Sequence, residues 1–305
     1  MEQYTLNNGM KIDAIGFGCY NAKEGDNYQI ISDAIESGFR FFDTASIYCT
    51  EKELGRAIRE SGIPREEFFI QSKLWIDEMG YENAKDALER TLSRLEMDYL
   101  DVYLIHWPRQ TPIFEGCPGH SEVEVPVHNY EENSDWKNLE IETYRAMEEM
   151  VDEGKIKAIG LSNFLPHHLM NILDNCRIKP VVDQLEVHLG YTQATAVKFA
   201  MDNDIRVEAW SPLGRSALFE EPFFKEMADK YHVTVAQLGL RFLYQMGIIP
   251  LPKATAPERQ KQNLDIFNFE ISEEDYYILA CMVPACWQHE HPDFLIPGRA
   301  SVFEQ

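Results

Sequence analysis

The chain has 305 residues, of which 51 are acidic and 28 are basic, so its formal net charge is −23. Its length suits a single α/β barrel domain, and its hydrophobic content of 45% is ordinary for a globular protein. Because DNA, RNA and anionic lipid surfaces would repel so acidic a chain, nucleic-acid and membrane partners are not expected.

Six cysteines are spread along the chain, and none of them forms a CxxC motif or a zinc-ligand spacing with histidines. No metal site is therefore expected. The N-terminal residues do not form a secretory signal, and no run of 18 apolar residues occurs in the sequence. These features predict a cytoplasmic protein with reduced thiols.

The chain begins with a predicted β-hairpin over residues 4–12, which has an Asn8-Gly9 turn. Eight short apolar runs predict strands at residues 14–18, 39–43, 68–73, 99–106, 156–162, 181–186, 206–210 and 247–250. Amphipathic stretches predict helices at residues 84–95, 139–152, 165–175, 192–203 and 236–245. This α/β alternation favours a (β/α)8 TIM barrel, with residues 1–305 as a single domain, over an open doubly wound sheet.

Two regions interrupt the alternation of strands and helices. Residues 109–136 form a long polar insert after the fourth predicted strand, and the tail from Cys281 has no clear periodicity. Long loops in compact domains are usually functional or disordered. Since the insert directly follows a strand, both regions are expected at the C-terminal face of the barrel.

Polar side chains stand at the C-terminal ends of successive predicted strands. The second, third and fourth strands end at Asp43, Lys73 and His106. The next three strands end in Ser162-Asn163, Gln184-Leu185-Glu186 and Trp210. A barrel gathers these ends around one mouth, where barrel enzymes place their chemistry. The pattern therefore predicts an active site there.

Residues 38–48, GFRFFDTASIY, followed by Glu51, resemble the signature of the aldo-keto reductase family. The segments KLW at 73–75 and LIHWP at 104–108 resemble the next two blocks of that family. The similarity continues through GLSNF at 160–164, QLE at 184–186, WSPLG at 210–214 and residues 252–263, and it ends at about residue 280. The resemblance implies an enzyme that reduces aldehydes or ketones with a nicotinamide cofactor.

The chemistry of carbonyl reduction explains four of these residues. Hydride attack leaves an alkoxide that needs a proton, and the Tyr48 phenol is the expected donor. A phenol with its usual pKa of about 10 is a weak acid near neutrality, and a lysine ammonium beside it lowers that pKa. Lys73 is therefore expected to tune Tyr48, Asp43 to pair with Lys73, and His106 to hydrogen bond the substrate oxygen. The four positions match the catalytic tetrad of the family that the sequence resembles.

The resemblance also implies how the cofactor is held. Ser162, Asn163 and Gln184 correspond to the residues that bind the nicotinamide carboxamide, and Trp210 to an aromatic residue, commonly tyrosine, that stacks on the ring. The pyrophosphate is expected against Ser211, Leu213 and Arg215. No GxGxxG motif follows a strand, so the sequence gives no support for a Rossmann site.

Residues 252–263 resemble the site for the adenosine 2′-phosphate. Lys253 and Arg259 supply positive charge there, with further expected contacts from Thr255, Gln262 and Asn263. The chain departs from the family at Ala254, where serine is usual, and at Gln262, where glutamate is frequent. NADPH is therefore the expected cofactor, with measurable activity also expected with NADH.

The substrate pocket is expected to be lined by Tyr20, Trp75 and Trp107, with the insert and the tail completing it. Such aromatic walls suit a sugar, a keto-sugar acid or a small aryl or alkyl carbonyl compound equally well. Two alternatives remain open at this point. One is a non-catalytic module of the same fold that senses nicotinamide, and the other is a metal hydrolase using Asp43, His106, Glu186 and His188. Nothing in the sequence marks a subunit interface, so a monomer is expected.

Overall fold

The computed structural model describes residues 1–20, 26–108, 135–214 and 219–281. Eight parallel strands lie in the order β10-β9-β8-β7-β6-β5-β4-β3, so neighbours in the sheet are also neighbours in sequence. They are β3 (Phe17–Gly18), β4 (Phe41–Asp43), β5 (Phe69–Leu74), β6 (Leu100–Ile105), β7 (Ile156–Ser162), β8 (Val182–Glu186), β9 (Arg206–Trp210) and β10 (Ile249–Pro250). Gly16 N donates to Pro250 O and Gly18 N to Pro252 O, both at 3.1 Å, which closes the barrel between its end strands.

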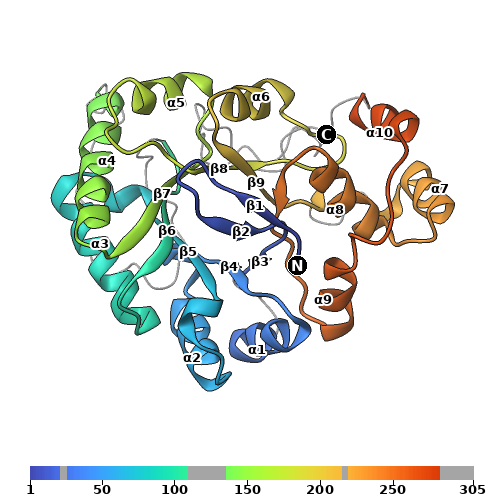
Figure 1. Ribbon diagram of the computed structural model, residues 1–305, viewed down its shortest axis with the longest axis horizontal. Coiled ribbons are helices and arrows are strands. Elements are labelled where there is room, and N and C mark those ends of the chain that lie inside the picture. The colour runs from blue at the N-terminus through green and yellow to red at the C-terminus, as the bar shows by residue number, and fades with distance from the viewer. Residues whose placement is uncertain (21–25, 109–134, 215–218, 282–305) are drawn as a thin grey trace, which may run out of the picture.

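Helices surround the strands (Figure 1). They are α1 (Asn27–Ser37), α2 (Glu51–Glu60), α3 (Tyr81–Leu95), α4 (Trp136–Asp152), α5 (Pro166–Leu173), α6 (Ala194–Asp202), α7 (Pro222–Lys230), α8 (Val235–Gln245), α9 (Pro257–Leu264) and α10 (Glu273–Ala280). The predicted (β/α)8 barrel is confirmed, and all eight predicted strands are present with shifts at their ends. The five predicted helices are also present, while α1, α2, α7, α9 and α10 were not predicted.

The predicted N-terminal hairpin is present as β1 (Gln3–Thr5) and β2 (Lys11–Asp13), which pair antiparallel. Gly9 in its turn has φ +88°, a conformation that glycine adopts without steric cost. The hairpin crosses the end of the barrel that faces the viewer in Figure 1. Leu6 and Ile12 are buried against apolar side chains inside the barrel, so the hairpin plugs the end opposite the C-terminal ends of the strands.

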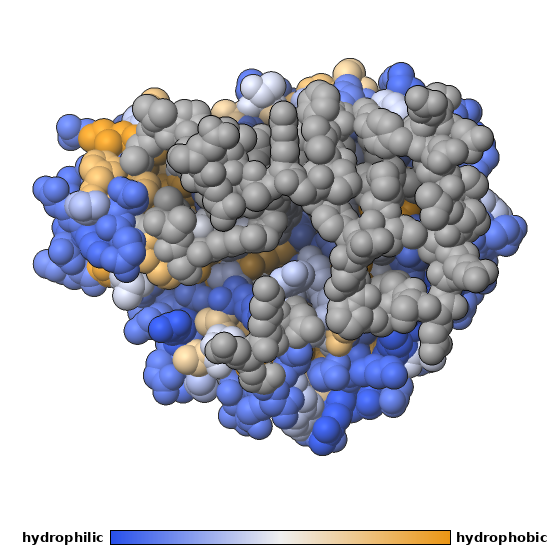
Figure 2. Space-filling view, turned by 180° about the vertical axis from the view of Figure 1, so that it is seen from behind, coloured by the Kyte–Doolittle hydropathy of each residue, from blue (hydrophilic) through white to orange (hydrophobic). Residues whose placement is uncertain are grey.

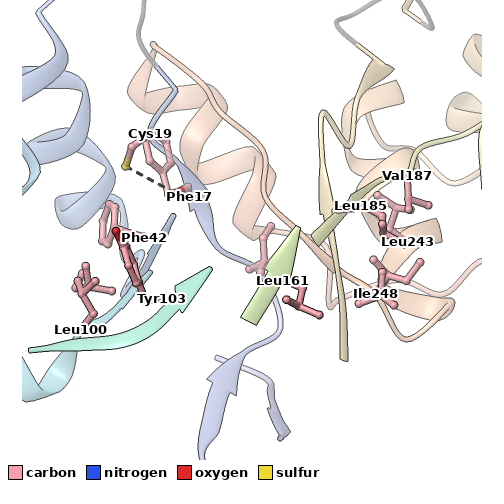
Figure 3. Packing of buried hydrophobic residues seen from close by; sticks show 14 of the residues in the cluster. Phe17, Cys19, Phe42, Leu100, Tyr103, Leu161, Leu185, Val187, Leu243 and Ile248 are labelled. Atoms are coloured by element: carbon pink, nitrogen blue, oxygen red, sulfur yellow. Dashed lines mark hydrogen bonds between the residues drawn. The ribbon is translucent and has the colours of Figure 1, made fainter. Parts of the chain in front are cut away.

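Side chains along each strand alternate between the inside of the barrel and the helices. The inner cluster includes Phe41, Val102, Leu104, Val182 and Ile249. The outer cluster lies between strands and helices and includes Phe42, Tyr103, Leu161, Leu185 and Leu243, which Figure 3 shows with their neighbours. Apolar packing on both faces explains why these strands read as nearly continuous hydrophobic runs.

The helix predicted at residues 84–95 shows how the sequence determines its packing. In α3 the buried positions Ala84, Ala87, Leu88, Leu92 and Leu95 are spaced by three or four residues, as the predicted stripe required. On the face opposite the hairpin, shown in Figure 2, the visible described residues are mostly hydrophilic, as expected for an acidic chain. No helix among the described residues is long and apolar enough to cross a membrane.

Candidate active site

A buried ion pair joins the ends of β4 and β5. Lys73 is fully buried, and its Nζ donates to Oδ1 and Oδ2 of Asp43, both at 2.7 Å. The same nitrogen donates to Thr44 O at 3.0 Å and to Tyr48 Oη at 3.4 Å. The structure thus brings together three of the four predicted catalytic side chains, with the ammonium between the carboxylate and the phenol.

Tyr48 ends a 3-10 helix, Ser46–Tyr48, that follows β4. Ser46 Oγ donates to Oε2 of the buried Glu78 at 2.8 Å, which ties the start of this helix to the turn after β5. Cys49 has φ +56°, a left-handed conformation that ends the helix directly after Tyr48. Thr50 Oγ1 donates to Cys19 O at 2.9 Å. These contacts fix the chain before and after Tyr48 and so hold its phenol next to Lys73.

The protonation states of Lys73 and Tyr48 follow from their burial and from the charged groups beside them. Burial acts to lower the pKa of Lys73, but Asp43 and Tyr48 together act against it, and the pKa is raised overall. Burial raises the pKa of Tyr48 to about 12, while the Lys73 ammonium acts to lower it. The expected influence of Lys73 is therefore present, but the net pKa of Tyr48 is raised because desolvation is the larger effect. Near neutral pH, Lys73 is charged and Tyr48 keeps its proton.

His106 follows β6 and completes the predicted group of four. Its ring centre lies 5.6 Å from that of Tyr48 and 4.9 Å from that of Trp75. His106 is 7% exposed, and burial together with the charge on Lys73 holds its pKa well below the usual range. The imidazole is therefore neutral near pH 7. A neutral imidazole can donate one hydrogen bond without placing a second positive charge near Lys73.

The residues predicted to face the nicotinamide form a hydrogen-bonded chain across β7, β8 and β9. Trp210 Nε1 donates to Asn163 Oδ1 at 2.9 Å, and Asn163 Nδ2 donates to His106 O at 2.9 Å. Asn163 Nδ2 also donates to Ser162 Oγ at 3.1 Å, and Ser162 Oγ donates to Gln184 O at 3.0 Å. Asn163 has φ +64°, which turns its side chain back toward His106. All four predicted residues are thus brought together beside the tetrad.

Two further polar residues of this layer were not among the predicted site residues. Gln71 and Glu208 are fully buried. Gln71 Nε2 donates to Asp43 Oδ1 at 2.9 Å and to Glu208 Oε2 at 2.7 Å. Gln184 Nε2 makes the corresponding contacts at 3.0 and 2.8 Å. The two-residue period of strands could have found them, since Gln71 precedes Lys73, and Glu208 precedes Trp210, by two positions.

The predicted phosphate-binding residues lie beyond β10. Lys253 is half-buried before α9, and Arg259 is exposed in the first turn of that helix. Neither forms an ion pair with a carboxylate of the described residues. Burial lowers the pKa of Lys253. Thr255 and Gln262 are exposed and Asn263 is buried, whereas Ser211 and Leu213 lie directly after β9. Arg215 lies outside the described residues.

The predicted substrate-pocket residues are placed around the tetrad only in part. Trp75 contacts His106, and Tyr20 meets Tyr48 edge to face with ring centres 5.0 Å apart, although Tyr20 is 60% exposed. Trp107 directly follows His106 and is partly exposed. Most of the insert at residues 109–136, and the tail beyond Cys281, lie outside the described residues. Within the described part of the chain, no three His, Cys, Asp or Glu side chains are grouped as metal ligands.

The family model described as "Aldo/keto reductase family" matches residues 14–281 of this chain. The chain belongs to the aldo/keto reductase family. The glyoxal reductase of Bacillus subtilis is 38% identical to it over 271 residues, which cover 88% of each chain. The NADH-dependent D-xylose reductase of Candida parapsilosis is 36% identical, with 90% of each chain covered. The crystal structure of a Bombyx mori aldo-keto reductase in complex with NADP is similar with a TM-score of 0.80, 32% identity and 91% of each chain covered.

Membership of this family establishes the class of chemistry. The chain is an NAD(P)H-dependent oxidoreductase that acts on small carbonyl compounds, as its family does. This assignment favours the enzyme over the nicotinamide-sensing module that the sequence had left open. The predicted resemblance to aldo-keto reductases is confirmed.

Proposed function

We propose that this enzyme reduces small aldehydes and ketones with Tyr48 as the proton donor and with NADPH as the preferred cofactor. The observation that supports this proposal most directly is the contact of Lys73 Nζ with both Asp43 and Tyr48 in a fully buried position. A buried ammonium next to a phenol has a clear chemical use, because it stabilises the phenolate that remains after the proton has left.

The other tetrad residues support the same assignment of roles. Asp43 keeps Lys73 charged and in place, so that the ammonium faces the phenol when the proton moves. His106, held neutral, can donate a hydrogen bond to the carbonyl oxygen and share the charge that develops there. The bound nicotinamide supplies the hydride. Side chains of this chain orient the substrate, donate the proton and stabilise the charge that develops on the carbonyl oxygen.

The hydrogen-bonded chain beside the tetrad fits a nicotinamide carboxamide. Within the described residues, both Nδ2 protons of Asn163 and both Nε2 protons of Gln184 are already donated to protein acceptors. Gln184 Oε1 accepts no hydrogen bond from a described residue, and Asn163 Oδ1 accepts only one. These two oxygens are therefore the groups that would receive the amide protons of the carboxamide. The Trp210 indole would provide the apolar face for the ring.

The substrate proposal is limited to carbonyl compounds small enough to reach Tyr48 and His106 between aromatic walls. One relative is named for glyoxal and another for D-xylose, so short hydroxylated or dicarbonyl compounds enter the proposal beside aryl and alkyl aldehydes. Residues 1–305 are proposed to act as a single domain and as a monomer.

The proposed activity is tested by following NADPH and NADH absorbance with a panel of glyoxal, pentoses, keto-sugar acids and aryl aldehydes. Turnover of at least one carbonyl class, with a higher kcat/KM for NADPH than for NADH, is the expected result. Binding of either cofactor without turnover of any member of the panel would contradict it. The reverse reaction with the product alcohol and oxidised cofactor provides an independent check.

Cofactor preference is expected to depend on Arg259. Charge-assisted hydrogen bonds to a phosphate contribute about 1.5–3 kcal/mol each, and an exposed arginine belongs at the low end of that range. Arg259→Ala should therefore weaken NADPH binding about tenfold and leave NADH binding nearly unchanged. The measurement is the dissociation constant of each cofactor by tryptophan fluorescence.

Arg145 supplies a matched control for this variant. It is exposed on α4, on the opposite side of the barrel from α9 (Figure 1), and it forms no ion pair within the described residues. Arg145→Ala removes the same charge and should not change the affinity for either cofactor. Equal losses for NADPH and NADH in Arg259→Ala would mean that Arg259 supports the fold or the adenine, and a wild type that prefers NADH would overturn the preference.

A further inference from the structure

The inside of the barrel holds a second carboxylate next to the Asp43–Lys73 pair. Glu208 on β9 is fully buried, and its Oε2 accepts hydrogen bonds from Gln71 Nε2 at 2.7 Å and Gln184 Nε2 at 2.8 Å. The same two nitrogens donate to Asp43 Oδ1 at 2.9 and 3.0 Å. Two glutamine amides from β5 and β8 therefore bridge two carboxylates from β4 and β9.

This arrangement fixes the orientation of both amides. An ionised carboxylate only accepts hydrogen bonds, so with both carboxylates ionised each amide turns its nitrogen toward Asp43 and Glu208 and its oxygen away. The oxygen of Gln184 is the group that is left for the cofactor carboxamide. Removal of Glu208 would leave one proton of each amide without its acceptor, and an amide with one partner can rotate. Glu208 thus acts on both the Asp43–Lys73 pair and the orientation of Gln184.

We propose that Glu208 is a positioning residue for carbonyl reduction. It orients Gln71 and Gln184 against Asp43, and its charge acts on the Lys73–Tyr48 pair. The proposal rests on the proposed function, in which Tyr48 donates the proton. It assigns no contact between Glu208 and the substrate.

The surroundings of Glu208 make its charge state depend on pH near neutrality. Burial and the negative charge of Asp43 raise the pKa of Glu208 to about 7, and Gln184, Gln71 and Lys73 act in the opposite direction. Asp43 from β4 and Lys73 from β5 act on it electrostatically, and Asp183 from β8 interacts with it electrostatically as well. Burial raises the pKa of Asp183 well above its usual range.

The sign of the effect follows from Coulomb's law. Above about pH 7 the ionised Glu208 adds a second negative charge that acts on the Lys73 ammonium, which contacts Tyr48. That charge offsets part of the positive potential at the phenol, and a phenol in a less positive potential gives up its proton less readily. Below that pH the carboxyl group is neutral. The rate of reduction is therefore expected to fall as the pH rises through about 7, by about threefold to tenfold, which corresponds to a change of up to one pKa unit in the proton donor.

The test is Glu208→Gln, which keeps the size of the side chain and an oxygen acceptor for Gln71 and Gln184 but cannot ionise. The single-turnover rate of NADPH oxidation with a saturating aldehyde is measured from about pH 5.5 to pH 9. We expect an inflection near pH 7 in the wild type and none in Glu208→Gln, with NADPH affinity within about threefold of wild type. A wild type without this inflection, or a variant that retains it, would overturn the proposal.

Glu148→Gln is the matched control. Glu148 is a buried carboxylate on α4 whose Oε1 accepts from Ile178 N at 2.7 Å, outside the barrel interior. It should lose stability like any variant of a buried carboxylate and keep the wild-type pH profile. Tyr48→Phe is measured in parallel, because wild-type rates in that variant would refute the proton-donor assignment whatever the profile of Glu208→Gln.

A second measurement applies if Glu208→Gln does not fold. The carboxyl carbons of wild-type protein labelled with ¹³C-glutamate are titrated by NMR, and the same titration is repeated on Gln71→Leu, which removes one bridging amide. A glutamate resonance that titrates near pH 7 in the wild type and shifts in Gln71→Leu supports the proposal. Titration of all glutamate carboxyls below about pH 5, near their usual range, would overturn it.

Discussion

Tyr48→Phe is expected to slow the chemical step by about 10²–10⁴-fold, the usual contribution of a positioned general acid. The phenylalanine ring fills the same space above Lys73 and beside Tyr20, so the packing of the site should change little. Only the proton that would pass to the alkoxide is lost. Since the pKa of Tyr48 is raised to about 12, the wild-type phenol carries this proton throughout the neutral range.

The measurement for Tyr48→Phe is the single-turnover rate of NADPH oxidation, because steady-state turnover can be limited by product release. NADPH affinity should remain close to that of the wild type, since among the described residues the Tyr48 hydroxyl donates to no predicted cofactor-binding side chain. Tyr144→Phe is the control. It removes a buried hydroxyl that donates to Ile178 O at 2.7 Å and should leave the rate unchanged. A Tyr48→Phe variant as fast as Tyr144→Phe would show that another group donates the proton.

The barrel could be predicted from the sequence because its strands carry a simple signal. Most strands are largely apolar on both faces, and three successive strands end in a polar residue, so the sequence places Asp43, Lys73 and His106 at one mouth of the barrel. The order of the strands followed from their alternation with helices. The helix α2 was not predicted, although its buried residues Leu54, Ala57 and Ile58 form a helical stripe.

The internal network could not be predicted in the same way. Gln71 and Glu208 lie within buried strands, where a polar residue has no partner that neighbouring sequence can reveal. Gln71 and Asp43 are 28 positions apart, and Gln71 and Glu208 are 137 positions apart. Only closure of the barrel brings them within hydrogen-bonding distance. The sign of the net change in the pKa of Tyr48 was missed for a related reason, since desolvation depends on everything packed around the phenol.

Lys73→Met and Asp43→Asn are both expected to reduce the rate of reduction by about 10²–10³-fold, as removal of one preorganised charge does. They should differ in how the loss depends on pH. Lys73→Met removes the ammonium at every pH, so its loss is nearly constant. Asp43→Asn leaves the ammonium buried without its carboxylate, and burial alone lowers the pKa of a lysine. Activity of Asp43→Asn should therefore persist best at low pH and decline as the pH rises.

The stability of Asp43→Asn should depend on pH in the opposite direction from its activity. The two measurements together therefore test the charge state of Lys73. Breaking a buried ion pair by removal of one partner costs about 3–5 kcal/mol. A lysine whose folded-state pKa is depressed binds fewer protons in the folded than in the unfolded protein, so the free energy of unfolding rises with pH. In the wild type, where the pKa of Lys73 is raised, the contribution of Lys73 is lost only above its usual pKa of about 10.4. In Asp43→Asn alone, the free energy of unfolding measured in urea should therefore rise from about pH 6 to pH 9 while the single-turnover rate falls. Parallel pH profiles in wild type, Asp43→Asn and Lys73→Met would show that the buried pair does not control the charge at the phenol.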